Sequence, residues 1–211
     1  MDKQQQIDTF SRFTKVSRET LSNFRKYEEI IIEANKTLNL IGKSTISNIW
    51  ERHILDSFQV IDFIDKNDNI ITDLGSGAGF PGIILALAAK DRKTLLKIKL
   101  IDKSRKKTMF LKSTIKKLKL NVEVSCENVF EDKKKLIGDI FVARAFKPLP
   151  VILKLINIKI TNFKKFFIFL GKTGKSELLE ASKSWDIKYK QRVSITSSDS
   201  LIIEINKLKK K

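Results

Sequence analysis

The sequence predicts an α/β fold, with a mostly parallel sheet covered by helices on both faces and preceded by a helical extension. Residues 1–66 show only helical periodicity, whereas strands and helices alternate through 67–211. A glycine-rich turn at 73–82 follows the first buried strand and opens a helix, as ligand-binding turns of parallel sheets do. We therefore expect a helical segment over 1–66, packed on the core, and a Rossmann-like domain over 67–211.

The composition predicts a reduced, basic protein with a polyanionic partner. The 211 residues include 42 Lys and Arg against 24 Asp and Glu, which gives a formal net charge of +18. Nucleic acid is the favoured partner, because Lys and Arg bind phosphates with counterion release; a codon-driven excess of lysine is the alternative. A single cysteine excludes an internal disulfide. There is no apolar signal region and no membrane-length apolar run, so we expect a cytoplasmic protein.

The N-terminal residues carry one apolar stripe at helical spacing. Apolar side chains recur at intervals of three and four from Phe10 to Ala34. Ser17 is the expected N-cap of the second helix in this stretch. A break near 39–44 precedes a third expected helix over 47–64.

The third expected helix contains the only histidine of the chain, His53. Arg52 and Asp56 are four residues apart and so share one helix face. We interpret these residues as an exposed ion pair beside a histidine that caps or packs. A polar cluster at the mouth of a ligand site is the alternative.

The remaining elements follow from buried runs bounded by turn residues. The expected strands cover 70–74, 98–102, 121–125, 138–143 and 165–170, followed by an antiparallel hairpin of 188–195 and 201–205. The expected helices begin at 83, 103, 149 and 175, and the helix over 103–118 is strongly basic.

The turn after the first strand points to a nucleoside cofactor. Gly75, Gly77 and Gly79 alternate after Asp73, so we expect a positive φ at Gly75 and bare backbone for a ligand at the other two. Gly77, Gly79 and Gly82 match the dinucleotide spacing, which leaves a nicotinamide-dependent oxidoreductase open. A carboxylate at Asp73 would repel a pyrophosphate, however, and suits the cationic part of S-adenosylmethionine.

Polar residues follow the later strands, where ligands of parallel sheets bind. Asp102 ends the second strand at a distance typical of an acid that binds a ribose diol, and it is also a candidate N-cap. The stretch 125–129 would hold an adenine ring, with Cys126 expected to be a small buried residue. Arg144 follows the fourth strand, where a residue that meets the substrate is usual.

Five stretches together resemble one family. They are Asn39-Leu40, Arg52-His53-Ile54-Leu55-Asp56-Ser57, Asp73-Leu74-Gly75-Ser76-Gly77-Ala78-Gly79-Phe80-Pro81-Gly82, Leu100 to Lys107 with Phe110-Leu111, and Ala143-Arg144-Ala145-Phe146. The glycine stretch resembles the first motif of class I S-adenosylmethionine-dependent methyltransferases. The combination is similar to the bacterial small-subunit ribosomal RNA guanine-N7 methyltransferases, also called glucose-inhibited division protein B. The resemblance implies a seven-stranded sheet and methyl transfer to one guanine N7 of 16S rRNA in the cytoplasm.

The motifs and the resemblance together give a cofactor-binding set for S-adenosyl-L-methionine. Its members are Asp73, Gly75, Gly77, Gly79, Phe80, Asp102, Lys103, Ser104, Asn128, Val129 and Arg144. Asn128 and Val129 stand where the family often has Ala-Glu or Val-Glu. We expect 16S rRNA or the small ribosomal subunit as partner, a monomer, and no metal.

No catalytic acid, base or nucleophile is assigned. Guanine N7 has a free lone pair and no proton, so alignment with the methyl donor supplies most of the rate. Arg144 is treated as a binding residue that could also contact the guanine. A non-catalytic rRNA-binding module remains an alternative at this point.

Overall fold

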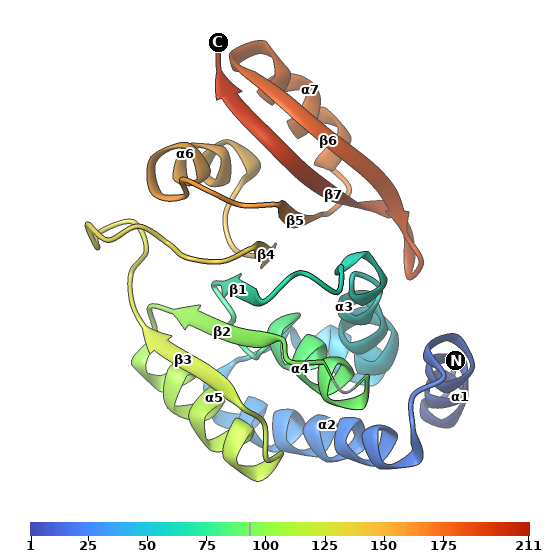
Figure 1. Cartoon of the computed structure of the whole chain (residues 1–211). Coiled ribbons are helices and arrows are strands. Elements are labelled where there is room, and N and C mark those ends of the chain that lie inside the picture. Colours follow the sequence, from blue (N-terminus) through green and yellow to red (C-terminus); the bar gives the residue numbers. More distant parts are fainter. Residues whose placement is uncertain (93) are drawn as a thin grey trace.

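The structure, a computed structural model, describes residues 1–92 and 94–211 (Figure 1). These residues form one seven-stranded sheet in the order β3-β2-β1-β4-β5-β7-β6. Its strands are β1 Ile70–Leu74, β2 Lys97–Asp102, β3 Val122–Cys126, β4 Ile140–Arg144, β5 Lys165–Leu170, β6 Trp185–Ser194 and β7 Ser197–Lys210. The mostly parallel sheet and its closing antiparallel hairpin are confirmed, and the hairpin is longer than predicted.

The centre of the sheet is a topological switch point. β1 pairs in parallel with β2 on one side and with β4 on the other. The chain therefore leaves β1 toward one edge of the sheet and later returns to its opposite side. Ligands of such sheets bind in the crevice at the carboxyl ends of the two strands that flank this point.

Helices cover both faces of the sheet (Figure 1). They are α1 Lys3–Thr14, α2 Arg18–Leu38, α3 Asp56–Phe58, α4 Gly82–Asp91, α5 Arg105–Lys117, α6 Leu149–Lys159 and α7 Gly174–Ser184. α2 lies across α4 and α5 as an outer layer, whereas α6 and α7 lie beside the β6–β7 hairpin. α4 is enclosed between the sheet and α2, which explains its unbroken apolar run from 83 to 89. None of the helices described combines the length and apolarity that crossing a bilayer takes.

The third helix expected over 47–64 is wrong as a single regular element. A 3-10 turn at Lys43–Asn48 leads into one π-helical turn at Trp50–Leu55, the short α3, and a second 3-10 turn at Ile61–Phe63. All residues from 54 to 61 are buried. The segment thus has no solvent face, and the single-face periodicity on which a regular surface helix depends does not apply to it. By contrast, the predicted Ser17 N-cap of α2 is confirmed.

One apolar cluster joins the N-terminal elements to the sheet. Phe10 of α1 lies with its ring 5.0 Å from Phe24 of α2 and 5.3 Å from Trp50. The same cluster continues into α4, β1 and β2. The Tyr27 hydroxyl also donates to the Ala78 carbonyl of the glycine turn at 2.7 Å. The division between 1–66 and 67–211 stays a prediction, and these contacts show how tightly the two parts pack.

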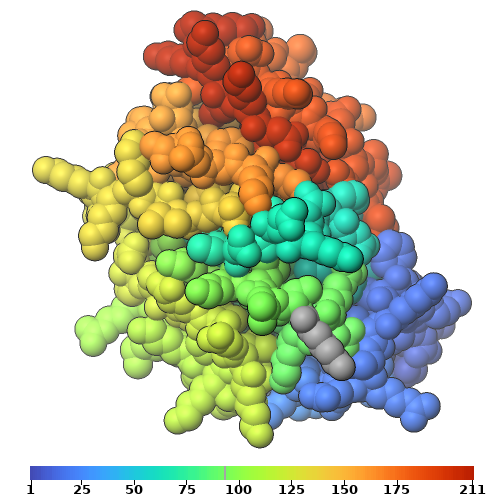
Figure 2. All heavy atoms as spheres, in the orientation of Figure 1, coloured from blue at the N-terminus to red at the C-terminus, as the bar shows by residue number. Residues whose placement is uncertain are grey.

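The loop between β3 and β4 extends outward from the sheet edge. Figure 2 shows it as a yellow projection at the left of the molecule, clear of the helical layers. Lys133, Lys134 and Lys135 in this loop are exposed. The loop leaves β3 beside the carboxyl ends of β1 and β2, so its first residues contribute to the site described next.

Candidate functional site

The turn after β1 is held in a left-handed backbone conformation. Gly75, Gly77 and Gly79 have φ values of 72°, 57° and 102°, which side chains with a Cβ rarely adopt. The backbone N–H groups of Gly75 and Ser76 donate to the Ile101 carbonyl at 2.8 and 3.1 Å. The turn is thereby fixed against the end of β2, and the positive φ expected at Gly75 is confirmed.

The three glycines face different surroundings. An added Cβ at Gly75 would lie 2.2 Å from the Phe146 ring, whereas one at Gly77 would meet only the Gly75 carbonyl at 3.7 Å. An added Cβ at Gly79 would lie 2.7 Å from Tyr27 Oη. The expectation that Gly79 offers bare backbone to a ligand is therefore wrong, because protein side chains occupy the space beside it. Position 79 requires a glycine because Tyr27 of α2 packs against the turn there.

Asp102, at the end of β2, is hydrogen-bonded to the glycine turn. Its Oδ2 accepts from the Gly77 N–H at 2.9 Å and its Oδ1 accepts from the Ser104 N–H at 2.8 Å. Asp102 is nearly buried, and each oxygen keeps a lone pair for a further donor. Asp102 was a candidate N-cap of the following helix α5, but the N-cap is Ser104, whose side chain accepts from the Lys107 N–H.

A cavity of about 310 Å³ opens at the carboxyl ends of β1, β2, β3 and β4. We call it the first cavity. Its lining includes six of the predicted cofactor residues, namely Gly75, Asp102, Lys103, Ser104, Asn128 and Val129. Asp73, Gly77, Gly79, Phe80 and Arg144 lie outside this lining. The first cavity is thus built by residues from four strand ends that are far apart in the chain.

Two aromatic residues that the sequence reasoning missed form one wall of the first cavity. Phe130 and Phe146 stack with ring centroids 5.8 Å apart and planes inclined by 21°. The Lys147 ammonium lies 5.8 Å from the Phe130 ring. Both aromatics lie in the loops that begin at strand ends, Phe130 after β3 and Phe146 after β4, and that position is the signal that would have found them.

The side chain of Asn128 is turned toward its own loop. Its Nδ2 donates to Glu131 Oε1 at 2.6 Å, and its Oδ1 accepts from the Phe130 N–H at 3.3 Å. Asn128 therefore contributes chiefly its backbone to the first cavity.

Cys126 is exposed at the end of β3, so its predicted burial is wrong. β3 is the edge strand of the sheet, and its residues face solvent or are only partly covered.

Asp73 lies beneath the turn and is fully buried. Its Oδ2 accepts from the Gly82 N–H at the start of α4 at 3.0 Å. Its Oδ1 has no hydrogen-bond partner among the described residues. Burial raises the pKa of this carboxyl to about 7. The predicted role of Asp73 toward a cationic ligand stays a prediction.

Arg144 is the centre of a polar cluster beside the first cavity. Its Nε donates to Asp56 Oδ2 at 2.9 Å, and its Nη2 donates to the Arg52 carbonyl at 2.6 Å. Its Nη1 lies 3.1 Å from His53 Nδ1. The expected exposed pair between Arg52 and Asp56 is therefore wrong, because Asp56 is buried and pairs with Arg144. The alternative, a polar cluster near the ligand site, describes the geometry.

His53 is neutral and its tautomer is fixed by its neighbours. Burial lowers the pKa of its imidazole to about 3, and the positive charges of Arg144 and Arg52 act in the same direction. Because a guanidinium only donates, Nδ1 accepts from Arg144, and Nε2 carries the proton toward Thr45 Oγ1 at 2.8 Å. The ring stacks on Phe80 at 5.1 Å. Phe80 is thus a packing partner of the polar cluster.

A further cavity of about 280 Å³, which we call the second cavity, lies beside this cluster. Its lining combines Arg144, Asp56 and His53 with residues of β5 and of the β6–β7 hairpin. Ala145 lines both the first and the second cavity. The two cavities therefore meet at the residue that follows β4. Among residues 1–92 and 94–211, no group of His, Cys, Asp and Glu side chains is placed to hold a metal ion.

Comparisons with known proteins agree on a fold and a family. Among solved structures, the 16S rRNA methylase RmtB superposes with a TM-score of 0.54 at 13% identity, covering 91% of this chain and 76% of its own. TYW2 of M. jannaschii, in complex with AdoMet, gives a TM-score of 0.51 at 17% identity, covering 76% of this chain and 77% of its own. These likenesses show the Rossmann-like fold of class I methyltransferases.

Sequence relatives are more similar. A Pelagibacter ubique protein named ribosomal RNA small subunit methyltransferase G is 46% identical over 198 residues, covering 93% of this chain and 92% of that protein. A Rickettsia felis protein of the same name is 34% identical over 197 residues, covering 93% and 98%. The family model described as rRNA small subunit methyltransferase G matches residues 20–204. On these matches, the chain belongs to the rRNA small subunit methyltransferase G family.

Proposed function

We propose that this protein transfers a methyl group from S-adenosyl-L-methionine to N7 of a specific guanine in 16S rRNA. The observation that carries the proposal is the first cavity at the switch point of the sheet. There Gly75 lets the Phe146 ring pack directly against the turn, and Asp102 presents a carboxylate. Membership of a methyltransferase family disfavours the nicotinamide-dependent oxidoreductase.

The donors and walls of the first cavity fit this cofactor. The free lone pairs of Asp102 suit the two hydroxyls of a ribose. The apolar side chains of Ile101, Val129 and Phe130 suit the faces of an adenine ring. The cavity volume of about 310 Å³ lies at the lower end of the range for small-molecule sites. Asp73, Gly77, Gly79 and Phe80 were predicted to bind the cofactor but lie outside this lining, so we propose that they shape the turn instead.

The residues of this chain bind and align, and none has to move a proton. When bound, the cofactor supplies a methyl group on a positively charged sulfur. The lone pair of guanine N7 forms the new bond to that carbon, and the old carbon–sulfur pair stays on sulfur. N7 carries no hydrogen, so no general base is needed, and alignment supplies the rate. The neutral His53 therefore acts by position.

The charge of the chain supports an RNA partner. The excess of 42 basic over 24 acidic residues gives +18 on a surface that has to meet phosphates. Lys103, Lys107 and Lys147 line the first cavity, and the β3–β4 loop that starts at its edge carries the exposed Lys133, Lys134 and Lys135. We further propose that the protein acts as a monomer in the cytoplasm, without a metal, on 16S rRNA or the small ribosomal subunit.

The direct test is transfer of a tritiated methyl group to small ribosomal subunits that lack the modification. We expect label in 16S rRNA, and chain scission specific for N7-methylguanine should map it to one position. Gly75→Val should lose cofactor binding in calorimetry, because its side chain would occupy the place of the Phe146 ring and strain a φ of 72°.

Gly42→Val is the matched control, since a Cβ there meets its first neighbour only at 3.8 Å. Folding of both variants is checked by circular dichroism. Binding of RNA without any methyl transfer would instead favour a non-catalytic rRNA-binding module. Label on another atom would contradict the N7 assignment.

A further inference from the structure

The second cavity lies where the methyl acceptor has to be. Ala145 lines both cavities, so a group in the second cavity faces a ligand of the first across a single residue. A cavity of about 520 Å³ bounded by Asn69 and Leu96 is at the other end of the strands and cannot serve. Another cavity of about 310 Å³ also shares Ala145 with the first cavity, but its lining lacks Arg144. Position together with the presence of Arg144 therefore selects the second cavity.

Arg144 keeps hydrogen-bond donors for a ligand of this cavity. A guanidinium has five N–H groups in a fixed plane. Three of them are engaged by Asp56, His53 and the Arg52 carbonyl. Two remain, and Arg144 is part of the cavity lining. A planar ligand with acceptor atoms on its edge suits such a fork.

Asp56 holds Arg144 in place and is itself saturated. Its Oδ2 accepts from Arg144, while its Oδ1 accepts from Gln59 Nε2 at 2.9 Å, Ser194 Oγ at 2.8 Å and Thr196 Oγ1 at 3.0 Å. The carboxylate is therefore a positioning residue that ties β4 to the β6–β7 turn. It also balances the charge of Arg144, which leaves the cavity suited to a neutral ligand.

The other walls of the second cavity suit a flat ring. Phe169 of β5 is partly exposed and lines the cavity, as do the apolar side chains of Leu201 and Ile202. The Ser200 hydroxyl lies on the same wall and donates to Ser197 Oγ at 3.2 Å, which leaves its lone pairs free for a donor. The lining thus offers the aromatic face of Phe169, the hydrogen-bond donors of Arg144 and the acceptor oxygen of Ser200.

We propose that the second cavity receives the target guanine base, turned out of its stack, with Phe169 against its face and Arg144 donating to O6. This inference rests on the proposed function and names the acceptor side of that site. Enzymes that modify a base inside a structured nucleic acid take it out of the stack in this way.

Holding O6 leaves the N7 lone pair free to face the first cavity past Ala145. N7 gains the methyl carbon, sulfur keeps the electron pair of the broken bond, and the positive charge moves from sulfur to the base. The Ser200 oxygen accepts from the Watson–Crick edge, which carries the N1 and N2 hydrogens of guanine. An adenine base, with an amino group in place of O6, would oppose its N–H to the donors of Arg144.

The sharpest test narrows the cavity without touching its polar groups. Gly171 lines the second cavity, and a Cβ added there meets nothing within 4 Å. Gly171→Leu should therefore fold normally but raise KM for unmodified subunits or lower kcat by roughly tenfold or more. Its affinity for S-adenosylmethionine in calorimetry should equal that of the wild type. Gly42→Leu is the matched control, at an exposed glycine that lines neither cavity.

A second variant removes the stacking face. Phe169→Ala should lower kcat/KM by about 5- to 150-fold, the range that base stacking on an aromatic residue supports. Retention of wild-type kcat/KM by both Gly171→Leu and Phe169→Ala would overturn the proposal. A parallel loss of S-adenosylmethionine affinity would also overturn it, because the cavity would then belong to the cofactor.

A binding experiment separates this proposal from the proposed function. With S-adenosylhomocysteine saturating the first cavity, guanosine 5′-monophosphate at millimolar concentration should shift the aromatic NMR signals of Phe169, and adenosine 5′-monophosphate should not. Gly171→Leu should abolish the shift. These outcomes do not depend on methyl transfer, so an inactive wild type would contradict the proposed function alone. Equal shifts with both nucleotides, or none with either, would overturn the guanine site.

Discussion

The partly buried His53 and the fully buried Asp73 make opposite contributions to the pH dependence of this protein's stability. His53 has a folded-state pKa of about 3 instead of 6.5, and Asp73 has one of about 7 instead of 3.8, in both cases chiefly because burial disfavours the charged form. Between pH 3 and 6.5 the unfolded state binds the extra proton at His53, so stability rises with pH. Between pH 3.8 and 7 the folded state binds it at Asp73, so stability falls with pH.

Single substitutions should separate these two opposite contributions to the change of unfolding free energy with pH. His53→Gln removes the contribution that rises with pH, so the free energy of unfolding should fall more steeply with pH than in the wild type between about pH 4 and pH 6.5. Asp73→Asn removes the falling contribution, so stability should climb toward about pH 6.5 and then level off. Urea unfolding at half-unit steps of pH measures both. Profiles of the two variants that run parallel to the wild type would mean that neither group carries the pH dependence.

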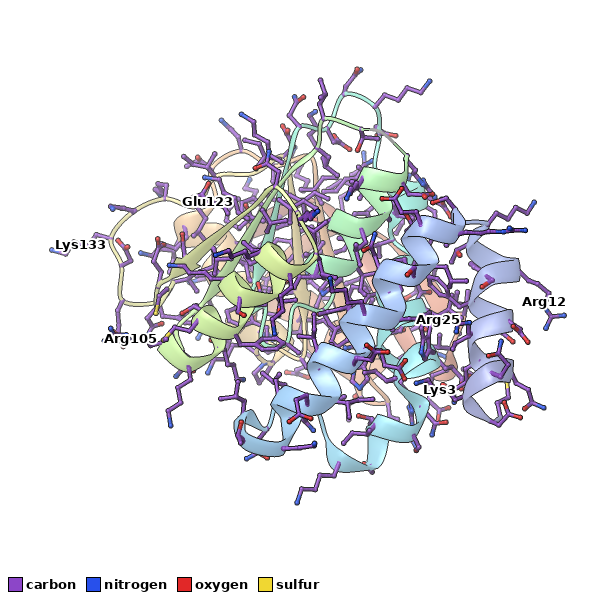
Figure 3. All side chains as sticks on the ribbon, turned by 90° about the horizontal axis from the view of Figure 1, so that it is seen from below. Lys3, Arg12, Arg25, Arg105, Glu123 and Lys133 are labelled. Carbon is purple, nitrogen blue, oxygen red and sulfur yellow. The ribbon has the colours of Figure 1, made fainter. Side chains whose placement is uncertain are left out.

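At the scale of single elements, α5 is a basic helix that contributes to the lining of the first cavity. Arg105 and Lys106 at its start and Lys112 further along are exposed, whereas Lys103 and Lys107 also line the first cavity. Figure 3 shows Arg105 and Lys133 projecting on the same side of the molecule, away from Arg12 on α1. We expect RNA to bind on this side, because residues of α5 and of the loop that carries Lys133 line the first cavity.

Charge reversal on α5 tests that face without disturbing the cavity. The triple change Arg105→Glu, Lys106→Glu and Lys112→Glu should weaken 16S rRNA binding. The slope of log K against log salt should fall by about one for each phosphate that the variant no longer neutralises, because fewer counterions are then released. S-adenosylmethionine affinity should stay unchanged.

The matched control carries the same charge change on the exposed hairpin lysines Lys188, Lys190 and Lys209. An equal reduction of the slope in this control would mean that the charge acts only as a diffuse field.

On the scale of the whole molecule, the N-terminal helices and the sheet share one core. Trp50 lies in the N-terminal part and packs on Phe10, whereas Trp185 lies in the cluster formed with α6 and α7. The chain has only these two tryptophans. Each half of the protein therefore carries its own fluorescent reporter.

These reporters should detect a single cooperative transition. In Trp185→Phe the remaining Trp50 signal should coincide with far-UV circular dichroism across a urea titration, and in Trp50→Phe the Trp185 signal should do the same. The shared cluster of α1, α2 and α4 is the physical reason, because its removal would expose apolar surface on both sides. A Trp50 transition at lower urea than the dichroism change would show that residues 1–66 unfold on their own.

Features set by residues close together in the chain could be predicted from the sequence, whereas contacts between distant residues could not. The central strands β1, β4 and β5 were predictable because each is a mostly buried run bounded by turn residues. Gly75 and Asp102 were predictable because their position at a strand end defines their role. The pairing of Arg144 with Asp56 spans 88 residues, and that of Ser194 with Asp56 spans 138. No rule of sequence spacing predicts contacts between residues so far apart in the chain. The exposure of Cys126 likewise depends on the order of strands in the sheet.

The link between Ser194 and Asp56 has a consequence for the timing of activity. The β6–β7 hairpin follows every other part of the site in the order of synthesis, and chains fold from the N-terminus as they emerge. Until that hairpin docks, Asp56 lacks the hydroxyl partners that steady it, and Arg144 has an incomplete anchor. A nascent chain would therefore carry a nearly finished sheet with an unfinished acceptor site. An enzyme whose substrate is ribosomal RNA would in this way stay inert toward the particle that is translating it.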